Sequence, residues 1–293
     1  MYISYDGFQW WIADSGLSGY DWKRMIWDGE KLVMVAANYN KLAYSYTGEG
    51  SSWQETGVVL TTNTGWTGIA YSKSLNRYVC CNNTGDFVVY GSNFNTQWTV
   101  AHTGISGNCR AIAYGEGLGF VVVGEHQASF STDGITWNAV TIDNGQIFYN
   151  VGYGSRGFIA TDINGHVYKS TNGTSWSLTF SLGAGVSCYN IAYGGGWYCT
   201  TWQFNHAYVT KDLVNWEHYD IGYDEPAGLA YGNGLFTIGQ ADYNDYRGAA
   251  IPVSGCYMSY RLMMERIYPP GSIYISMNST DPKFVLGFGT WTQ

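Results

Sequence analysis

The sequence contains little charge. Lys, Arg, Asp and Glu together make up 12% of its 293 residues, and the formal net charge is −8. Proteins that bind nucleic acid or an anionic membrane neutralise phosphate groups with a stripe of Lys and Arg, and the sequence shows no such stripe. We therefore expect neither a nucleic-acid partner nor an anionic membrane partner.

Long apolar runs, a secretory leader and proline are also scarce. The apolar stretch 32–37 has the length of a buried strand, far short of the roughly 20 residues of a membrane span. Residues 1–6 lack the basic and apolar regions of a signal peptide. We expect no membrane insertion and folding in a cytoplasm. The five prolines argue against a Pro-rich linker.

The cysteines follow no metal or redox pattern. Six are present, without a CxxC spacing, and most lie inside apolar strand-like runs. Buried free thiols are therefore favoured over three disulfides, which suits a reducing compartment. His166 and His206 lie 40 residues apart and a run of Asp and Asn covers 242–245, but without an HExxH motif we expect no metal and no cofactor.

Aromatic residues and glycine are abundant instead, and they recur with a period. The chain holds 26 Tyr, 13 Trp and 39 Gly, a composition typical of short strands joined by tight turns. The unit Ser-x-Asp-Gly-x-x-Trp occurs at 131–137, with related copies at 4–10, 170–176 and 210–216. With two looser copies, its tryptophans lie 39 to 45 residues apart, at Trp10, Trp53, Trp98, Trp137, Trp176 and Trp216.

A second motif repeats out of phase with the first. The sequence Ile-Ala-Tyr-Gly at 112–115 recurs at 191–194, and as Leu-Ala-Tyr-Gly at 229–232, with weaker copies starting at 25, 69 and 151. Six copies of two motifs, about 40 residues apart, predict an all-β fold: a six-bladed β-propeller over residues 1–262. The second motif is assigned to the innermost strand, and each Trp is expected to pack between neighbouring blades.

The ends of the repeat array predict how the ring closes. The array begins with a third-and-fourth-strand unit at residues 2–12 and finishes with an inner pair at 229–240. Joining the two completes a sixth blade and hides both sheet edges. Residues 256–261 resemble the first unit, so either segment is a candidate for that third strand.

The turns and the C-terminal segment each resemble a known family. The Ser-x-Asp-Gly-x-x-Trp turns resemble a shortened Asp-box, the structural turn of sialidase-type (BNR-like) propellers. Residues 268–276 (Tyr-Pro-Pro-Gly-Ser-Ile-Tyr-Ile-Ser), 278–282 and 288–291 (Phe-Gly-Thr-Trp) resemble a module of bacteriophage tail-fibre and baseplate proteins. In that family the chain runs on past Gly-Thr-Trp, whereas here Gln293 follows closely. The resemblance implies a phage tail context, with 263–293 as a short C-terminal extension and attachment segment.

A propeller places the turns between second and third strands on the same face as the blade-to-blade connections. We call this the loop face, and the opposite face, with the Asp-Gly turns, the turn face. The loop face is predicted to be rich in Asn, His and aromatic residues, the types that hydrogen-bond sugar hydroxyls and stack on a pyranose. The candidate glycan-binding residues are Trp202, Phe204, Asn205, His206, Tyr39, Asn40, His126, Tyr243 and Trp66.

These observations predict a binding protein and no catalytic residues. The leading hypothesis is a phage receptor-binding protein (adhesin) at the virion tail tip, folded in the host cytoplasm, whose partners are host-surface polysaccharide or wall glycan and other tail proteins. A homotrimer is expected by analogy with tail fibres. One alternative is a structural tail-tip or baseplate component. The other is a sialidase-like glycoside hydrolase or depolymerase, which requires a carboxylate pair or an Arg cluster; Arg24, Arg110, Arg77 and Arg156 beside the inner strands do not form a convincing triad.

Overall fold

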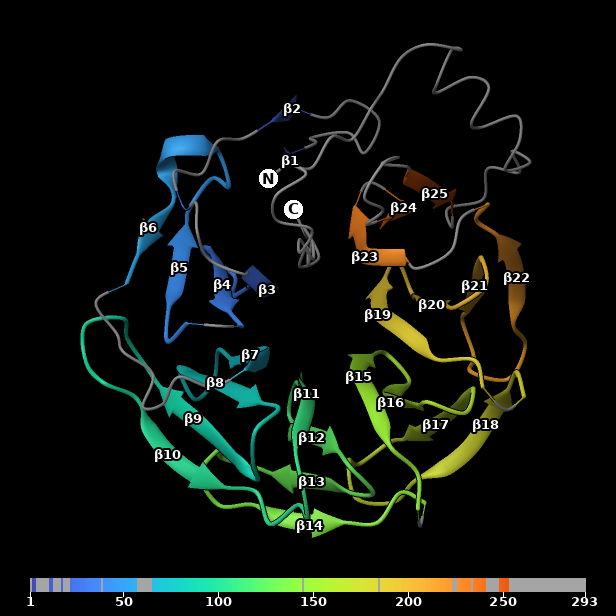
Figure 1. Cartoon of the computed structure of the whole chain (residues 1–293), viewed down its shortest axis with the longest axis horizontal. Helices are drawn as coiled ribbons and strands as arrows, with labels where there is room; N and C mark the ends of the chain where they lie inside the picture. The colour runs from blue at the N-terminus through green and yellow to red at the C-terminus, as the bar shows by residue number, and fades with distance from the viewer. Residues whose placement is uncertain are drawn as a thin grey trace.

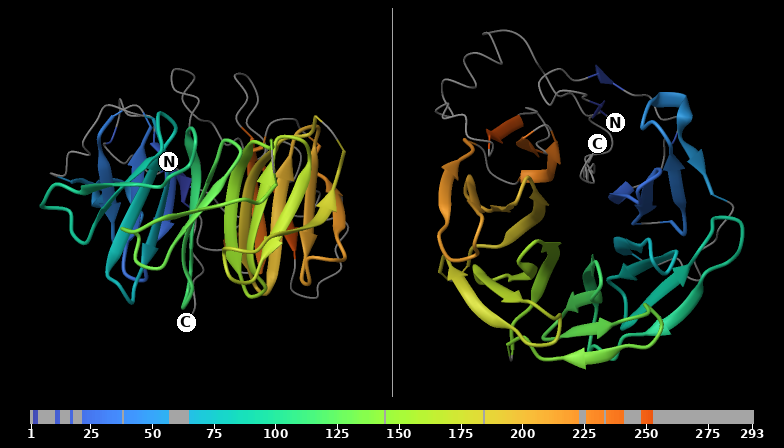
Figure 2. Two further views of the ribbon diagram at one scale, coloured as in Figure 1. Left: turned by 90° about the horizontal axis from the view of Figure 1, so that it is seen from below. Right: turned by 180° about the vertical axis from the view of Figure 1, so that it is seen from behind.

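The fold is a ring of antiparallel β-sheets whose strands are arranged outward from a central channel (Figure 1). The computed structural model describes residues 2–3, 11–12, 17, 22–37, 39–56, 65–143, 145–183, 185–222, 226–232, 234–240 and 248–252. Seen from the side, the ring is a disc whose strands run roughly between its two faces (Figure 2). This arrangement is a β-propeller, as the repeat predicts.

Five blades have four strands each, in chain order from the channel outward. Their strands are β3 (Trp22–Trp27), β4 (Leu32–Ala36), β5 (Leu42–Ser45) and β6 (Gln54–Glu55); β7 (Trp66–Ser72), β8 (Arg77–Asn82), β9 (Phe87–Gly91) and β10 (Thr99–His102); β11 (Cys109–Gly115), β12 (Gly119–Gly124), β13 (Ala128–Ser131) and β14 (Asn138–Val140); β15 (Phe148–Gly154), β16 (Gly157–Asp162), β17 (His166–Ser170) and β18 (Ser177–Ser181); β19 (Cys188–Gly194), β20 (Trp197–Trp202), β21 (His206–Thr210) and β22 (Glu217–Asp220). A single 3-10 turn, η1 (Gly50–Ser52), precedes β6.

The prediction of six blades closed by the N-terminal strands is wrong. The described residues form five four-stranded blades, a three-stranded sheet of β23 (Pro226–Gly232), β24 (Leu235–Gln240) and β25 (Gly248–Pro252), and a separate pair of β1 (Tyr2–Ile3) and β2 (Trp11–Ile12). The strand beside β24 is β25, so residues 2–12 do not supply it. The sequence Gly-Ala-Ala-Ile-Pro carries no Ser-x-Asp-Gly turn, which is why the repeat did not mark it. Residues 256–261 lie outside the described part.

The inner-strand motif has a packing reason. A Cβ at Gly115 would overlap the ring of Tyr153, and one at Gly154 would overlap Tyr193. Each glycine therefore leaves room for the tyrosine of the next blade, whose inner strand lies beside it. The Tyr-Gly pair thus couples neighbouring blades.

The core lies between the blades. Every residue of the second strands β4, β12 and β16 is buried. Trp137 packs against a cluster that joins Val79 of β8 to Phe120 of β12, and Trp98 is itself buried in a cluster shared by two blades. The structure confirms that these tryptophans pack between blades. Five cysteines are confirmed as buried free thiols, Cys80, Cys81, Cys109, Cys188 and Cys199, and Cys256 lies outside the described residues.

Candidate functional site

The loop face is held together by contacts between successive blades. Backbone hydrogen bonds join neighbouring blades in three places. The N–H groups of Trp66 and Cys109, at the start of their blades, donate to the turn carbonyls of Ala37 and Gly85, each at 3.1 Å. In the third, the N–H of His126 in a turn donates to the carbonyl of Gln146 at the start of the next blade, at 2.8 Å. These hydrogen bonds cross from blade to blade, so they hold the backbone of the loop face in place. Side chains of the loop face therefore project from a fixed backbone.

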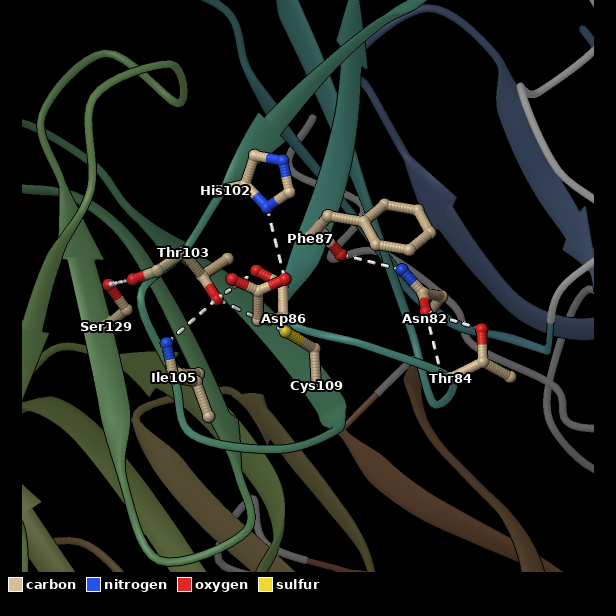
Figure 3. A network of polar contacts seen from close by, with 9 residues as sticks. All are labelled: Asn82, Thr84, Asp86, Phe87, His102, Thr103, Ile105, Cys109 and Ser129. Carbon is tan, nitrogen blue, oxygen red and sulfur yellow. Dashed lines mark hydrogen bonds and ion pairs between the residues drawn. The ribbon is translucent and has the colours of Figure 1, made fainter.

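Figure 3 shows one such region between β8 and β11. The Thr103 hydroxyl donates to the Asp86 carbonyl at 2.6 Å, and Ser129 of the next blade donates to the Thr103 carbonyl at 2.6 Å. The Asp86 carboxylate lies 3.1 Å from Nδ1 of His102 on the surface. The polar side chains of this region therefore hydrogen-bond to one another and to the backbone.

Two predicted site residues lie in the core. Trp202 is 0% exposed and its indole donates to the Thr200 hydroxyl at 2.8 Å. Trp66 is likewise buried, and its indole donates to Asn40 at 3.3 Å. The expectation that Trp202 is an exposed loop residue is wrong, because it is the last residue of β20 and not part of the turn.

Phe204, Asn205 and His206 do form a projecting group. Phe204 is 57% exposed at the tip of the turn between β20 and β21. Phe204 and Asn205 have φ of 62° and 69°, a region that glycine and asparagine tolerate and a bulky residue rarely adopts. The Oδ1 atom of Asn205 is buried without a hydrogen-bond partner in the described part of the chain. Backbone strain of this kind concentrates at functional sites.

His206 belongs to a pair on the outer strands of the same blade. Its Nδ1 lies 2.9 Å from Nε2 of His218, and the Tyr208 ring stacks on His218 at 4.8 Å. Burial lowers the pKa of His218, and the neighbouring His206 lowers it further. The lowered pKa favours the neutral form of His218, in which one ring nitrogen can accept a hydrogen bond.

The remaining predicted residues lie elsewhere. Tyr39, which is 45% exposed, and Asn40 occupy the turn between β4 and β5, on the opposite side of the ring from β20 and β21 (Figure 1). His126 lies in the turn between β12 and β13, exposed and with φ of 67°. Tyr243 lies outside the described residues. Of the nine predicted residues, the structure therefore places Phe204, Asn205 and His206 together at one turn, and it does not bring the described ones into a single site.

The central channel holds a feature that sequence reasoning missed. All six inner strands have a register shift at their second residue, between the pairs Trp22/Arg24, Trp66/Gly68, Cys109/Ala111, Phe148/Asn150, Cys188/Asn190 and Pro226/Gly228. Each shift is a β-bulge at the loop-face end of the strand, where such irregularities re-aim side chains. No residue type marks these positions, so only an alignment of the six repeats to one another would have shown their common register.

Asparagine after the bulge joins one inner strand to the next. The Asn150 amide donates to the carbonyls of Cys188 at 3.0 Å and Tyr189 at 3.1 Å. Asn190, in the equivalent place, donates to the Pro226 carbonyl at 3.1 Å. Arg24 occupies the same position in β3 and donates to Oδ1 of Asn150 at 3.3 Å, so it bridges two inner strands on opposite sides of the channel (Figure 1).

The channel encloses a cavity of about 390 Å³. Its polar lining comes from Arg24, Thr67, Asn150 and Asn190, and its far end is lined by aromatic residues of the inner-strand motif, Trp27, Tyr71, Tyr114, Tyr153 and Tyr193. The cavity thus combines one cation, neutral hydrogen-bonding groups and aromatic rings.

A basic and aromatic pair lies at the start of the inner strands next to this cavity. Arg110 forms an ion pair with Glu125 at 2.9 Å, and its guanidinium lies 4.6 Å from the centre of the Tyr149 ring. Tyr149 is 39% exposed. The ring is therefore partly exposed and is held in place by its cation–π contact with Arg110.

The part of the chain that the structure describes contains no group of three or more His, Cys, Asp and Glu residues arranged to hold a metal ion. His166 instead lies 2.7 Å from Asp162 of its own blade, and the acidic run at 242–245 lies outside the described residues. Nor does any helix of this part have the length and apolar character needed to cross a membrane.

The comparisons with known proteins support two features of the chain. Residues 263–293 match the family model of the baseplate structural protein Gp10, C-terminal domain. This match covers a small part of the chain and lies outside the described residues. No curated protein matches the sequence. The match and the propeller together fit a component of a phage tail, and so a virion component.

Solved structures with the same architecture have dissimilar sequences. YCF48 bound to D1 peptide is 14% identical, with a TM-score of 0.61 over 80% of each chain. Catalytically inactive virginiamycin B lyase from Staphylococcus aureus with quinupristin is 11% identical, with a TM-score of 0.65 over 82% of this chain and 87% of that one. The Niastella koreensis GH74 enzyme is 17% identical, with a TM-score of 0.57 over 81% of this chain and 37% of that one. At these identities the likeness concerns the fold alone.

Proposed function

We propose that the chain is a receptor-binding protein of a phage tail and that it recognises host-surface glycan with its loop face. The observation that carries the proposal is the turn of Phe204 and Asn205: an exposed aromatic ring on a backbone with positive φ, beside the half-buried, hydrogen-bonding side chain of His206. A sugar site needs both an aromatic face and hydrogen-bonding groups. The match of residues 263–293 supplies the phage tail context.

Binding is favoured over hydrolysis by the lining of the channel. Glycoside hydrolysis ordinarily uses a pair of carboxylates a few ångströms apart. The described residues that line the cavity include no Asp or Glu, and Glu125 is engaged by Arg110. We therefore propose no catalytic activity.

The test is the binding of labelled protein to candidate host cells and their extracted wall glycans. Phe204→Gly removes the ring and relieves the positive φ, so it should weaken binding about tenfold or more while the melting temperature stays equal or rises. This corresponds to the ~1–3 kcal/mol typical of a lost aromatic contact. Val214→Gly is the matched control, because Val214 is 64% exposed on the turn face.

Equal loss in both variants, or none in Phe204→Gly, would remove this turn from the binding site. No binding of the wild-type protein to any host material would favour the second candidate function, a structural tail-tip component. That alternative has its own support, because exposed apolar side chains also lie on the turn face, at Tyr46, Leu75, Ile135 and Val214, and such residues contribute to protein interfaces.

A further inference from the structure

Arg24 is an exception among the residues that follow the bulges. Its counterparts in the other inner strands are Gly68, Ala111, Asn150, Asn190 and Gly228. Asn150 and Asn190 each hydrogen-bond to the next inner strand, and they do so with a neutral side-chain amide. A cation in this position is therefore more than the fold requires.

The described residues accept hydrogen bonds from few of the N–H donors of the Arg24 guanidinium. It makes one hydrogen bond, from Nη2 to Asn150, although an arginine carries five N–H donors. No Asp or Glu of the described part forms an ion pair with it. The nearby thiols of Cys81 and Cys188 supply no counter-charge, because burial raises the pKa of each to about 12.

Such an arrangement is costly unless something compensates it. A charge withdrawn from water is stabilised only by an opposite charge and hydrogen bonds. Burial lowers the pKa of Arg24, which reports the same cost, yet an arginine stays charged at neutral pH. The side chain of Arg24 is half-buried, and it lines a cavity large enough, at about 390 Å³, for a small ligand.

We propose that the channel binds the oxyanion of an acidic glycan, a carboxylate or a phosphate, on the guanidinium of Arg24. The planar fork of arginine matches both groups with two parallel hydrogen bonds. Thr67, Asn150 and Asn190 give the cavity around it a neutral polar lining, and Tyr149 is an exposed ring near the loop-face end of the inner strands. The identity of the ligand as a host glycan rests on the proposed function, whereas the anion site itself does not.

The net charge of the chain makes this site selective. With a formal charge of −8, the protein as a whole repels anions. Retention of an anion therefore depends on the local guanidinium and not on a general positive surface. A single substitution should abolish it.

The experiment is a titration of the full chain, followed by NMR or calorimetry, with glucuronate and with glycerol phosphate. Glucose and glycerol are the neutral counterparts. We expect at least one anion to bind tenfold or more tightly than its neutral counterpart, and Arg24→Gln to remove that difference. Arg156→Gln is the matched control, since Arg156 is exposed in the turn between β15 and β16 on the turn face, and it should leave affinity unchanged.

Binding of glucuronate alone identifies a carboxylate ligand, and binding of glycerol phosphate alone identifies a phosphate ligand; both outcomes support the site. Equal affinity for anions and neutral compounds, or anion binding that survives Arg24→Gln, would overturn it. If Arg24→Gln does not fold, Arg24→Lys takes its place. It keeps the charge but loses the fork, so affinity should fall several-fold, and an unchanged affinity would refute the proposal.

The host-cell assay separates this inference from the proposed function. Cell binding without any anion binding in the channel would refute the inference and leave the receptor-binding role intact. Anion binding at Arg24 without attachment to any host material would support the anion site and refute the receptor-binding role.

Discussion

The glycine that follows the inner-strand tyrosine sets the spacing between blades. At Gly154 the backbone of β15 approaches the Tyr193 ring so closely that a methyl group has no room. The same residue type recurs at this place in β11 and β19, where the rings of Tyr153 and Tyr231 lie against it. The glycine is retained for closeness of packing, since none of these three positions has a positive φ.

Gly154→Ala is therefore expected to destabilise the protein by about 1–3 kcal/mol, the cost of overpacking a well-packed interior. Urea unfolding followed by circular dichroism measures the change. Gly232→Ala is the control, because Gly232 ends β23 at the equivalent place and no atom of the described residues lies within 4 Å of its added Cβ. A loss of stability of similar size in both variants would contradict the packing argument.

At the scale of single elements, the Ser-x-Asp-Gly turns share one hydrogen-bond pattern, which different residues provide. Oδ1 of Asp133 accepts from the backbone N–H groups of Ile135 and Thr136, each at 2.8 Å. Asn172 does the same for Thr174 at 2.9 Å and Ser175 at 2.8 Å. The turn needs an acceptor oxygen at this position, and either a carboxylate or an amide supplies it.

Asp133→Ala should therefore cost about 1–2 kcal/mol of unfolding free energy, because two backbone donors lose their partner. Asp133→Asn should be close to neutral, with Asn172 as the natural precedent. Denaturant unfolding of the two variants side by side distinguishes them, and an equal loss in both would show that the charge matters.

The pH dependence of the same turn follows from its hydrogen bonds. Burial opposes ionisation of Asp133, but the N–H groups of Thr136 and Ile135 outweigh it and lower its pKa. A carboxyl with a lowered folded-state pKa stabilises the protein above its unfolded pKa of about 3.9 and loses that contribution as the pH falls through the folded value. The advantage of the wild type over Asp133→Ala should thus shrink below about pH 4.

The elements that a motif marks could be predicted from the sequence, and those without a motif could not. The inner strands and Asp-Gly turns carry recurrent residues, so their positions can be predicted from the sequence. β25 does not, because Gly248–Pro252 is short and lacks an aromatic residue, and this is why the last sheet was completed with the wrong segment. The burial of Trp202 was missed because residues 202–206 read as one aromatic stretch, whereas β20 ends at Trp202 and the turn begins after it.

At the scale of the whole molecule, the contacts on which the proposed anion site rests join distant parts of the chain. Arg24 and Asn150 are 126 positions apart, and no local pattern links them. The repeat predicts that inner strands face one channel, but not which side chains cross it. The loop-face prediction therefore includes the Phe204 turn, whose residues are neighbours in the sequence. It does not include the channel, whose residues come from distant inner strands.

Residues 263–293 match a family model of their own, which does not extend into the repeats, and this predicts that the propeller folds without them. A chain ending at residue 262 should keep its far-UV circular dichroism spectrum and melt within a few degrees of the full chain. Differential scanning calorimetry measures this. A large drop in melting temperature would show that residues 263–293 contribute to the folded ring.

The buried thiols bear on chemical durability. The thiolate is the reactive form of cysteine, and burial raises the pKa of Cys81, Cys109 and Cys188 to about 12, so at neutral pH these side chains are almost entirely protonated. They are also sealed from oxidants by the blades. These three cysteines are therefore protected from disulfide formation and sulfur oxidation, and a particle that leaves a reducing cell for an oxidising medium would keep this part of its covalent structure unchanged.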